Sequence, residues 1–154
     1  MKEATAKPEA IANFGFEAPA LSTYQYNPTG GSWTFSGALW NGSGISANGS
    51  GFTSANPPAP QGVQVAFIQS NGIISQTISG FVPGTAYTIT FAAAERAGPN
   101  QHGGESWNLT IDGQVIASYQ PAATATNYTD YTAAFTASAP MHTLAFVGTD
   151  LNGP

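Results

Sequence analysis

The sequence predicts an all-β protein, a two-sheet antiparallel β-sandwich or jelly roll with about eight or nine short strands. Three observations carry this prediction. Apolar and polar residues alternate with a period of two along several short segments, and no stripe of helical period has a useful length. The 18 glycines and 11 prolines supply turn signals between these segments, as in a chain of short strands.

The chain is expected to divide into two parts. Residues 1–10 are predicted to be a flexible polar leader, and residues 11–154 a single sandwich domain. Aromatic extended segments come first, at Tyr24 to Tyr26 and at Trp33 to Phe35. Later strands are predicted over residues 63–68, 73–78, 87–91, 107–111, 115–119, 128–137 and 142–147. Long irregular stretches, which are either functional or contain unrecognised strands, remain at residues 36–61, 95–105 and 120–127.

Two dipeptides predict hairpins. Asn71-Gly72 lies between the strands 63–68 and 73–78, and Asn-Gly favours a two-residue hairpin turn. Asp112-Gly113 similarly predicts that the strands on either side of it, 107–111 and 115–119, pair with each other.

Charge and composition exclude several classes of partner. The formal net charge is −5, and the folded part of the chain has a single cation, Arg96, because Lys2 and Lys7 fall in the predicted leader. Nucleic acid is therefore not an expected partner, and anionic membranes are disfavoured for the same reason. No apolar run approaches the length of a membrane span, and the absence of cysteine excludes disulfides and thiolate metal sites.

The order of several short motifs resembles a known family. The matching segments are residues 13–19, 24–28, 33–35, 48–53, 64–69, 91–96, 111–113, 128–135 and 142–148. Together they resemble the secreted bacterial β-sandwich modules of the galactose-binding-like fold, of carbohydrate-binding-module type, which are often appended to polysaccharide-degrading enzymes. The resemblance implies a non-catalytic carbohydrate-binding or adhesive module, in some members with a structural calcium ion.

The C-terminal end departs from this family's pattern. Sequences of this type continue past Leu151-Asn152-Gly153 with a Gly-Asp-Asn turn and a last strand, whereas this chain ends at Pro154. An open sandwich edge exposes unpaired backbone groups. Three expectations follow: the last strand has been removed, a neighbouring chain supplies it by strand addition, or residues 11–16 rearrange to fill the gap.

Aromatic and polar residues outside the clearest strands are the candidate ligand contacts. Trp33 and Trp107 lie in alternating segments and are expected in the core, whereas Trp40 falls outside any strand pattern. Arg96 either binds sugar hydroxyls or forms an ion pair with Glu95, Glu105 or Glu17. The predicted ligand-binding residues are Trp40, Tyr24, Tyr26, Arg96, Glu95, Gln101 and His102.

Catalysis and metal binding have weaker support in the sequence. Glu17, Glu95 and Glu105 are candidates for a pair of glycosidase carboxyls, but nothing in the sequence brings them together. No Ser-His-Asp or His-rich metal motif accompanies them, and the protein is predicted not to be an enzyme. No certain cofactor is implied. A structural calcium ion would use oxygens around Glu17, Asp130 and Asp150, although no EF-hand spacing supports it.

Two functions follow from this reading. The first is a carbohydrate-binding module that holds a glycan or polysaccharide on loops at one sheet edge. The alternative is a structural subunit of an extracellular assembly, such as a phage decoration, fibre or tail protein, which strand exchange with neighbouring subunits would complete. Both place the protein outside the cell or on a cell or virion surface.

Overall fold

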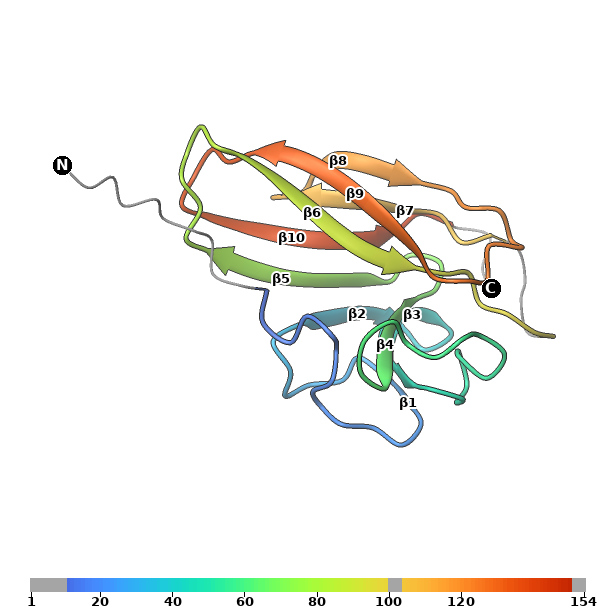
Figure 1. Cartoon of the computed structure of the whole chain (residues 1–154). Helices are drawn as coiled ribbons and strands as arrows, with labels where there is room; N and C mark the ends of the chain where they lie inside the picture. Colours follow the sequence, from blue (N-terminus) through green and yellow to red (C-terminus); the bar gives the residue numbers. More distant parts are fainter. Residues whose placement is uncertain (1–10, 100–103, 151–154) are drawn as a thin grey trace.

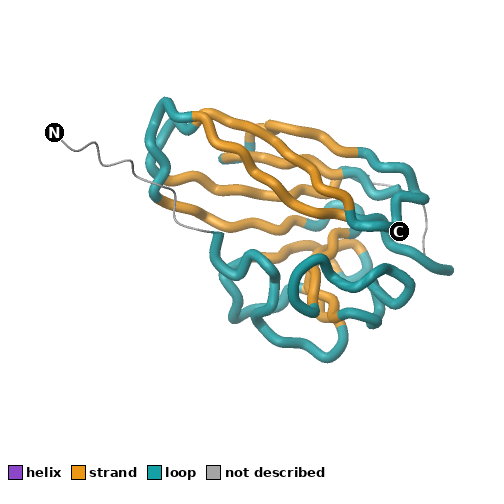
Figure 2. The backbone as a smooth tube through the Cα atoms, in the orientation of Figure 1, coloured by secondary structure: helices purple, strands orange, loops and turns teal. Residues whose placement is uncertain are grey.

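The computed structural model describes residues 11–99 and 104–150, and it is all-β over these residues (Figures 1 and 2). This confirms the predicted fold class. The strands are β1 (Tyr24–Tyr26), β2 (Thr34–Ala38), β3 (Asn41–Ala47), β4 (Gln64–Ile68), β5 (Ile73–Ser79), β6 (Ala86–Ala93), β7 (Trp107–Ile111), β8 (Gln114–Tyr119), β9 (Thr129–Thr136) and β10 (Met141–Gly148). In the described part of the chain, no helix is long and apolar enough to cross a membrane.

The strands form two antiparallel sheets. An eight-stranded sheet runs in the order β1-β3-β2-β5-β10-β7-β8, with β4 paired to β3 off this path, and β6 pairs with β9 in a second sheet. In Figure 1, β6 and β9 cover the part of the larger sheet that is formed by β5, β10 and β7, and β1 to β4 lie beside this double layer. In the described residues, β4 pairs only with β3 and β6 only with β9.

One predicted hairpin is confirmed and the other is wrong. β7 and β8 pair across Asp112-Gly113, and both turn residues have the positive φ that such a turn requires (50° and 80°). The turn before β5 also forms, with the Gly72 N–H donating to the Gln69 carbonyl at 2.9 Å. However, β4 pairs with β3 rather than with β5.

The core lies between the two layers. Ile45, Leu109 and Leu144 are almost completely buried, on β3, β7 and β10. Trp33 and Trp107 are buried as predicted, at 6% and 9% exposure. Residues from β6 and β9, including Ile89, Ala133 and Phe135, pack against this cluster and close the sandwich from the other side.

His142 stabilises the end of the sandwich beside the β7–β8 turn, as expected of a satisfied strand residue. Its side chain is 3% exposed, and its Nε2 accepts hydrogen bonds from the backbone N–H groups of Ser138 and Ala139, both at 3.2 Å. Nδ1 must therefore carry the proton, and it donates to Asp112 Oδ2 at 2.6 Å. Asp112 also accepts the Thr143 N–H, and these bonds lower the pKa of its carboxyl.

Candidate active site

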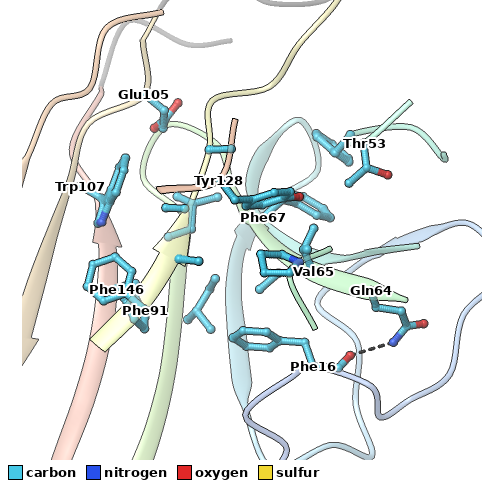
Figure 3. A pocket seen from close by; sticks show the side chains of 18 of the residues that line it. Phe16, Thr53, Gln64, Val65, Phe67, Phe91, Glu105, Trp107, Tyr128 and Phe146 are labelled. Carbon is cyan, nitrogen blue, oxygen red and sulfur yellow. Dashed lines mark hydrogen bonds between the residues drawn. The ribbon is translucent and has the colours of Figure 1, made fainter. Parts of the chain in front are cut away.

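A cavity of about 510 Å³ is lined by residues of β4, β6, β7 and β10. This volume falls within the range of small-molecule sites. Figure 3 shows Phe91, Trp107 and Phe146 on one side and Val65 and Phe67 on the other. The aromatic residues that line the cavity are Phe14, Phe16, Trp33, Phe52, Phe67, Phe91, Trp107, Tyr128 and Phe146.

The aromatic wall follows from strand alternation. Phe91 on β6 and Phe146 on β10 point into the space between the sheets, and their rings meet edge to face with centroids 5.0 Å apart. Trp107 on β7 stacks on Tyr119 of β8 at 5.6 Å. Rings that pack against other rings form a rigid apolar surface, which suits an aromatic or cationic ligand.

The N-terminal loop completes the wall because Gln64 ties it to β4. The Gln64 Nε2 donates to the carbonyl oxygens of Phe16, at 2.7 Å (dashed in Figure 3), and of Pro19, at 3.1 Å. Its Oε1 accepts the Leu21 N–H. Gln64 is only 2% exposed, and both ends of its side-chain amide are hydrogen-bonded to the N-terminal loop. These bonds hold the Phe16 ring beside Trp33, with ring centroids 5.0 Å apart.

Two glutamates lie at one end of the cavity. Glu95 follows β6 and is 5% exposed, and Glu105 precedes β7. One Glu95 oxygen, Oε2, accepts the backbone N–H of Glu105 at 3.0 Å, which holds the two segments together. In the described residues, Glu105 Oε1 is buried and has no hydrogen-bond partner. A buried acidic oxygen without a protein partner is rare, and a bound water, an ion, a ligand or a catalytic role accounts for it.

Burial raises the pKa of both carboxyl groups. It raises the pKa of Glu105 to about 7, helped by the charges of Asp150 and Glu95 and opposed by the backbone N–H of Ser70. Burial also raises the pKa of Glu95, with the Glu105 N–H acting against it. A large fraction of Glu105 is therefore a neutral acid at pH 7, and it can donate a proton into an apolar space.

The raised pKa of Glu105 predicts how stability varies with pH. The folded protein holds this proton up to about pH 7, whereas an ordinary glutamate loses it near 4.5. The stability that the folded protein gains from binding this proton is thus fully present below about pH 4.5, and it is lost as the pH rises to about 7. We expect Glu105→Gln to be more stable than the wild type at pH 8 and to lose this part of the pH dependence, measured by urea unfolding from pH 5 to 8. A wild-type advantage at pH 8 would contradict the assignment.

The cavity gathers some of the predicted ligand residues. Arg96 and Glu95 both line it. Arg96 forms no ion pair with the described residues. Its guanidinium instead lies over the Phe52 ring, 4.7 Å from the centroid, and donates to the Gly51 carbonyl at 2.9 Å.

The remaining candidates lie elsewhere. Trp40 occupies the tip of the β2–β3 hairpin with φ of 72° and is 66% exposed, and Tyr24 and Tyr26 lie on β1. None of these three lines the cavity. Gln101 and His102 lie outside the described residues. The role of all these residues in ligand binding stays a prediction.

The described carboxylates do not assemble a metal centre. Over residues 11–99 and 104–150, no group of three or more His, Cys, Asp or Glu residues is arranged to hold a metal ion. Glu17, one of the three predicted calcium ligands, uses its Oε1 to accept the backbone N–H groups of Val63, at 2.9 Å, and Gln64, at 3.1 Å.

Sequence reasoning missed the aromatic wall of the cavity and the position of Glu105 at its end. Phe91 and Phe146 were counted only as strand residues, and Gln69 and Tyr128 were not singled out. One signal was available: Glu95 and Glu105 flank a single loop in a chain with only eight acidic residues. When a chain has so few carboxyl groups, those that the fold buries are candidates for a catalytic or binding role.

A half-buried acid at the end of an aromatic cavity between the sheets of a β-sandwich is an arrangement that many enzymes of small molecules use. Residues 7–152 match the family model of HpiC1-like cyclases, described as HpiC1 cyclase, and the chain belongs to this family. A similar solved structure is that of a cyclase from Fischerella sp. TAU in complex with 4-(1H-indol-3-yl)butan-2-one, with a TM-score of 0.69 and 23% identity over 96% of this chain and 90% of that chain. Among curated proteins, none matches.

These findings correct the function that was predicted from sequence. The chain belongs to a cyclase family, so the resemblance to carbohydrate-binding modules holds for the β-sandwich architecture alone, and the prediction that the protein is not an enzyme is wrong. A glycan partner, an adhesive role and a virion or surface-assembly role completed by strand exchange are wrong for the same reason. The physical cause is that nine aromatic residues line an internal cavity, which the sequence alone does not reveal.

Proposed function

We propose that this protein is a cyclase that binds a small, largely apolar aromatic molecule in the cavity and closes a ring in it by proton transfer from Glu105. The observation that carries the proposal is the buried, unpartnered Glu105 Oε1 at the end of an aromatic cavity. Membership of the cyclase family supports a ring-forming reaction. The indole ketone in the Fischerella cyclase supports an aromatic heterocycle with a short side chain as the class of ligand.

The proposed reaction is an isomerisation. The Glu105 carboxyl donates its proton to one carbon of a side-chain double bond, and the positive charge forms on the other carbon. The aromatic ring of the same molecule attacks that carbon, so a carbon–carbon bond closes the new ring. The ring carbon then loses its proton to the Glu105 carboxylate, which restores the acid, and product and substrate have the same mass.

The cavity would favour this path in two ways. The π faces of Phe91, Trp107 and Phe146 stabilise the cation without reacting with it. The apolar wall also excludes water, which would otherwise trap the cation as an alcohol. A low-dielectric site makes the proton transfer sensitive to the position of one acid, and the clamp from Glu95 to the Glu105 backbone fixes that position.

No step of this reaction is assigned to a metal. Among the described residues, Glu17 Oε1 accepts two backbone N–H groups, and no group of three or more His, Cys, Asp or Glu residues is arranged to hold a metal ion. A structural calcium ion near Glu17, Asp130 and Asp150 stays a prediction from the sequence.

Ligand mapping by NMR tests the proposed site. We expect 4-(1H-indol-3-yl)butan-2-one to bind the wild-type protein and to shift the amide signals of residues around Phe91, Glu105 and Trp107. The β7–β8 turn around Asp112 should serve as an internal control with unchanged signals, because it does not line the cavity. Shifts confined to that turn, or no binding at millimolar ligand, would overturn the proposal.

A further inference from the structure

Gln69 presents a buried amide to the cavity. It follows β4 directly, lines the cavity and is 8% exposed. Its backbone is held on both sides, since its N–H donates to the Gly42 carbonyl at 2.8 Å and its carbonyl accepts the Gly72 N–H at 2.9 Å. The side chain therefore leaves a rigid turn, which is what a positioning residue requires.

A relay from the β2–β3 hairpin sets the orientation of this amide. The Trp40 backbone N–H donates to the Tyr26 hydroxyl oxygen, and the Tyr26 hydroxyl is bonded to Gln69 Oε1. In this bond the Tyr26 hydroxyl donates and the Gln69 carbonyl oxygen accepts, so Oε1 is the end of the amide that faces Tyr26. The other end of the Gln69 side chain is the Nε2 amino group, for which no hydrogen bond to the described residues is found.

The position of Gln69 relates it to the acid. Its neighbour in the chain, Ser70, directs its backbone N–H at the Glu105 carboxyl, and both Gln69 and Glu105 line the cavity. The Gln69 amide and the Glu105 carboxyl, whose Oε1 has no hydrogen-bond partner among the described residues, thus line one cavity. A ligand in the cavity could accept from the amide and contact this oxygen.

We propose that Gln69 is a positioning residue that selects substrates with an uncharged hydrogen-bond acceptor, such as a ketone oxygen, and holds them against Glu105. This inference rests on the proposed function. A neutral acceptor fits better than a carboxylate because Glu95, Asp130 and Asp150 line the same cavity. Among the described residues of the lining the one cation is Arg96, which lies over Phe52 and bonds the Gly51 carbonyl.

A pair of ligands isolates this hydrogen bond. 4-(1H-Indol-3-yl)butan-2-one carries a ketone, and 3-butylindole has the same carbon skeleton without the oxygen. We expect Gln69→Leu to lower the preference for the ketone, given by the ratio of the two dissociation constants, by about 3- to 10-fold relative to wild type, as one neutral hydrogen bond provides. Tyr26→Phe should lower the same ratio less, because the amide keeps its donor but loses the proton that orients it.

The outcomes separate the two proposals. If neither ligand binds the wild-type protein, the proposed function fails. If both bind and the ratio is the same in wild type and Gln69→Leu, the role of Gln69 fails and the proposed function stands. A merely structural role would weaken both ligands equally and leave the ratio unchanged. Should Gln69→Leu not fold by circular dichroism, Gln69→Met repeats the test, since methionine has a similar length but no N–H to donate to the ketone.

Discussion

Glu105→Gln is expected to reduce ring closure by at least about 100-fold, because general acid catalysis by a positioned group contributes on that scale. A suitable probe is 3-(4-methylpent-3-enyl)indole, whose protonated alkene is a tertiary cation that C2 of the indole can attack to form a tetrahydrocarbazole of the same mass. In heavy water the product should carry one added deuterium at the carbon that was protonated. The measurement is product formation by liquid chromatography and mass spectrometry.

A matched variant controls for the loss of a carboxyl elsewhere. Asp112 lies at the β7–β8 turn, contacts His142 and does not line the cavity. We expect Asp112→Asn to lower stability but to retain turnover per folded molecule. Glutamine keeps the shape of Glu105, so binding of the indole ketone should change little while turnover is lost. Wild-type turnover that survives in Glu105→Gln would show that another group donates the proton.

The second large effect is the pH dependence of turnover. Because the reaction needs protonated Glu105, whose pKa is raised to about 7, the rate should be level from about pH 5.5 to 6.5. It should then fall about tenfold for each pH unit well above 7. An ordinary glutamate would instead lose its proton near pH 4.5. The measurement is the initial rate with 3-(4-methylpent-3-enyl)indole across pH 5.5 to 9.

Two comparisons make this profile specific to Glu105. The residual rate of Glu105→Gln should have no break near pH 7, since amides do not titrate there. Circular dichroism at each pH must show a folded protein, so that the fall is not caused by unfolding. A wild-type rate that rises with pH would indicate a general base and would contradict the assignment of Glu105 as the acid.

Local patterns were sufficient for much of the fold. The β7–β8 hairpin was predictable because Asp112-Gly113 accepts positive φ at both positions, and this preference does not depend on the rest of the chain. Strands such as β6, with Tyr87, Ile89 and Phe91 on one face, were likewise visible because alternation is a property of the strand itself.

β3 was not predictable from the sequence, and because β4 pairs with it, the predicted pairing of β4 with β5 was wrong. Its sequence, Asn41–Ala47, includes Gly42 and Gly44 and was placed in an irregular stretch, since glycine weakens isolated strands. In the folded protein Gly44 pairs with Phe67, and a Cβ at Gly44 would lie 2.7 Å from that ring. The glycines make room for the aromatic ring, so the packing of distant residues, not local preference, forms β3 and joins β4 to it.

The sequence by itself determined the all-β class, the alternating apolar faces and the scarcity of charge, because these depend on residue type and spacing along the chain. Only the tertiary structure decided that Glu105 becomes an acid with a pKa near 7 in an aromatic cavity. That property arises from burial by residues of β4, β6, β7 and β10, and burial depends on contacts between segments far apart in the chain. The same glutamate in water would be an ordinary carboxylate, and the same aromatic residues on an outer surface would resemble a sugar-binding platform.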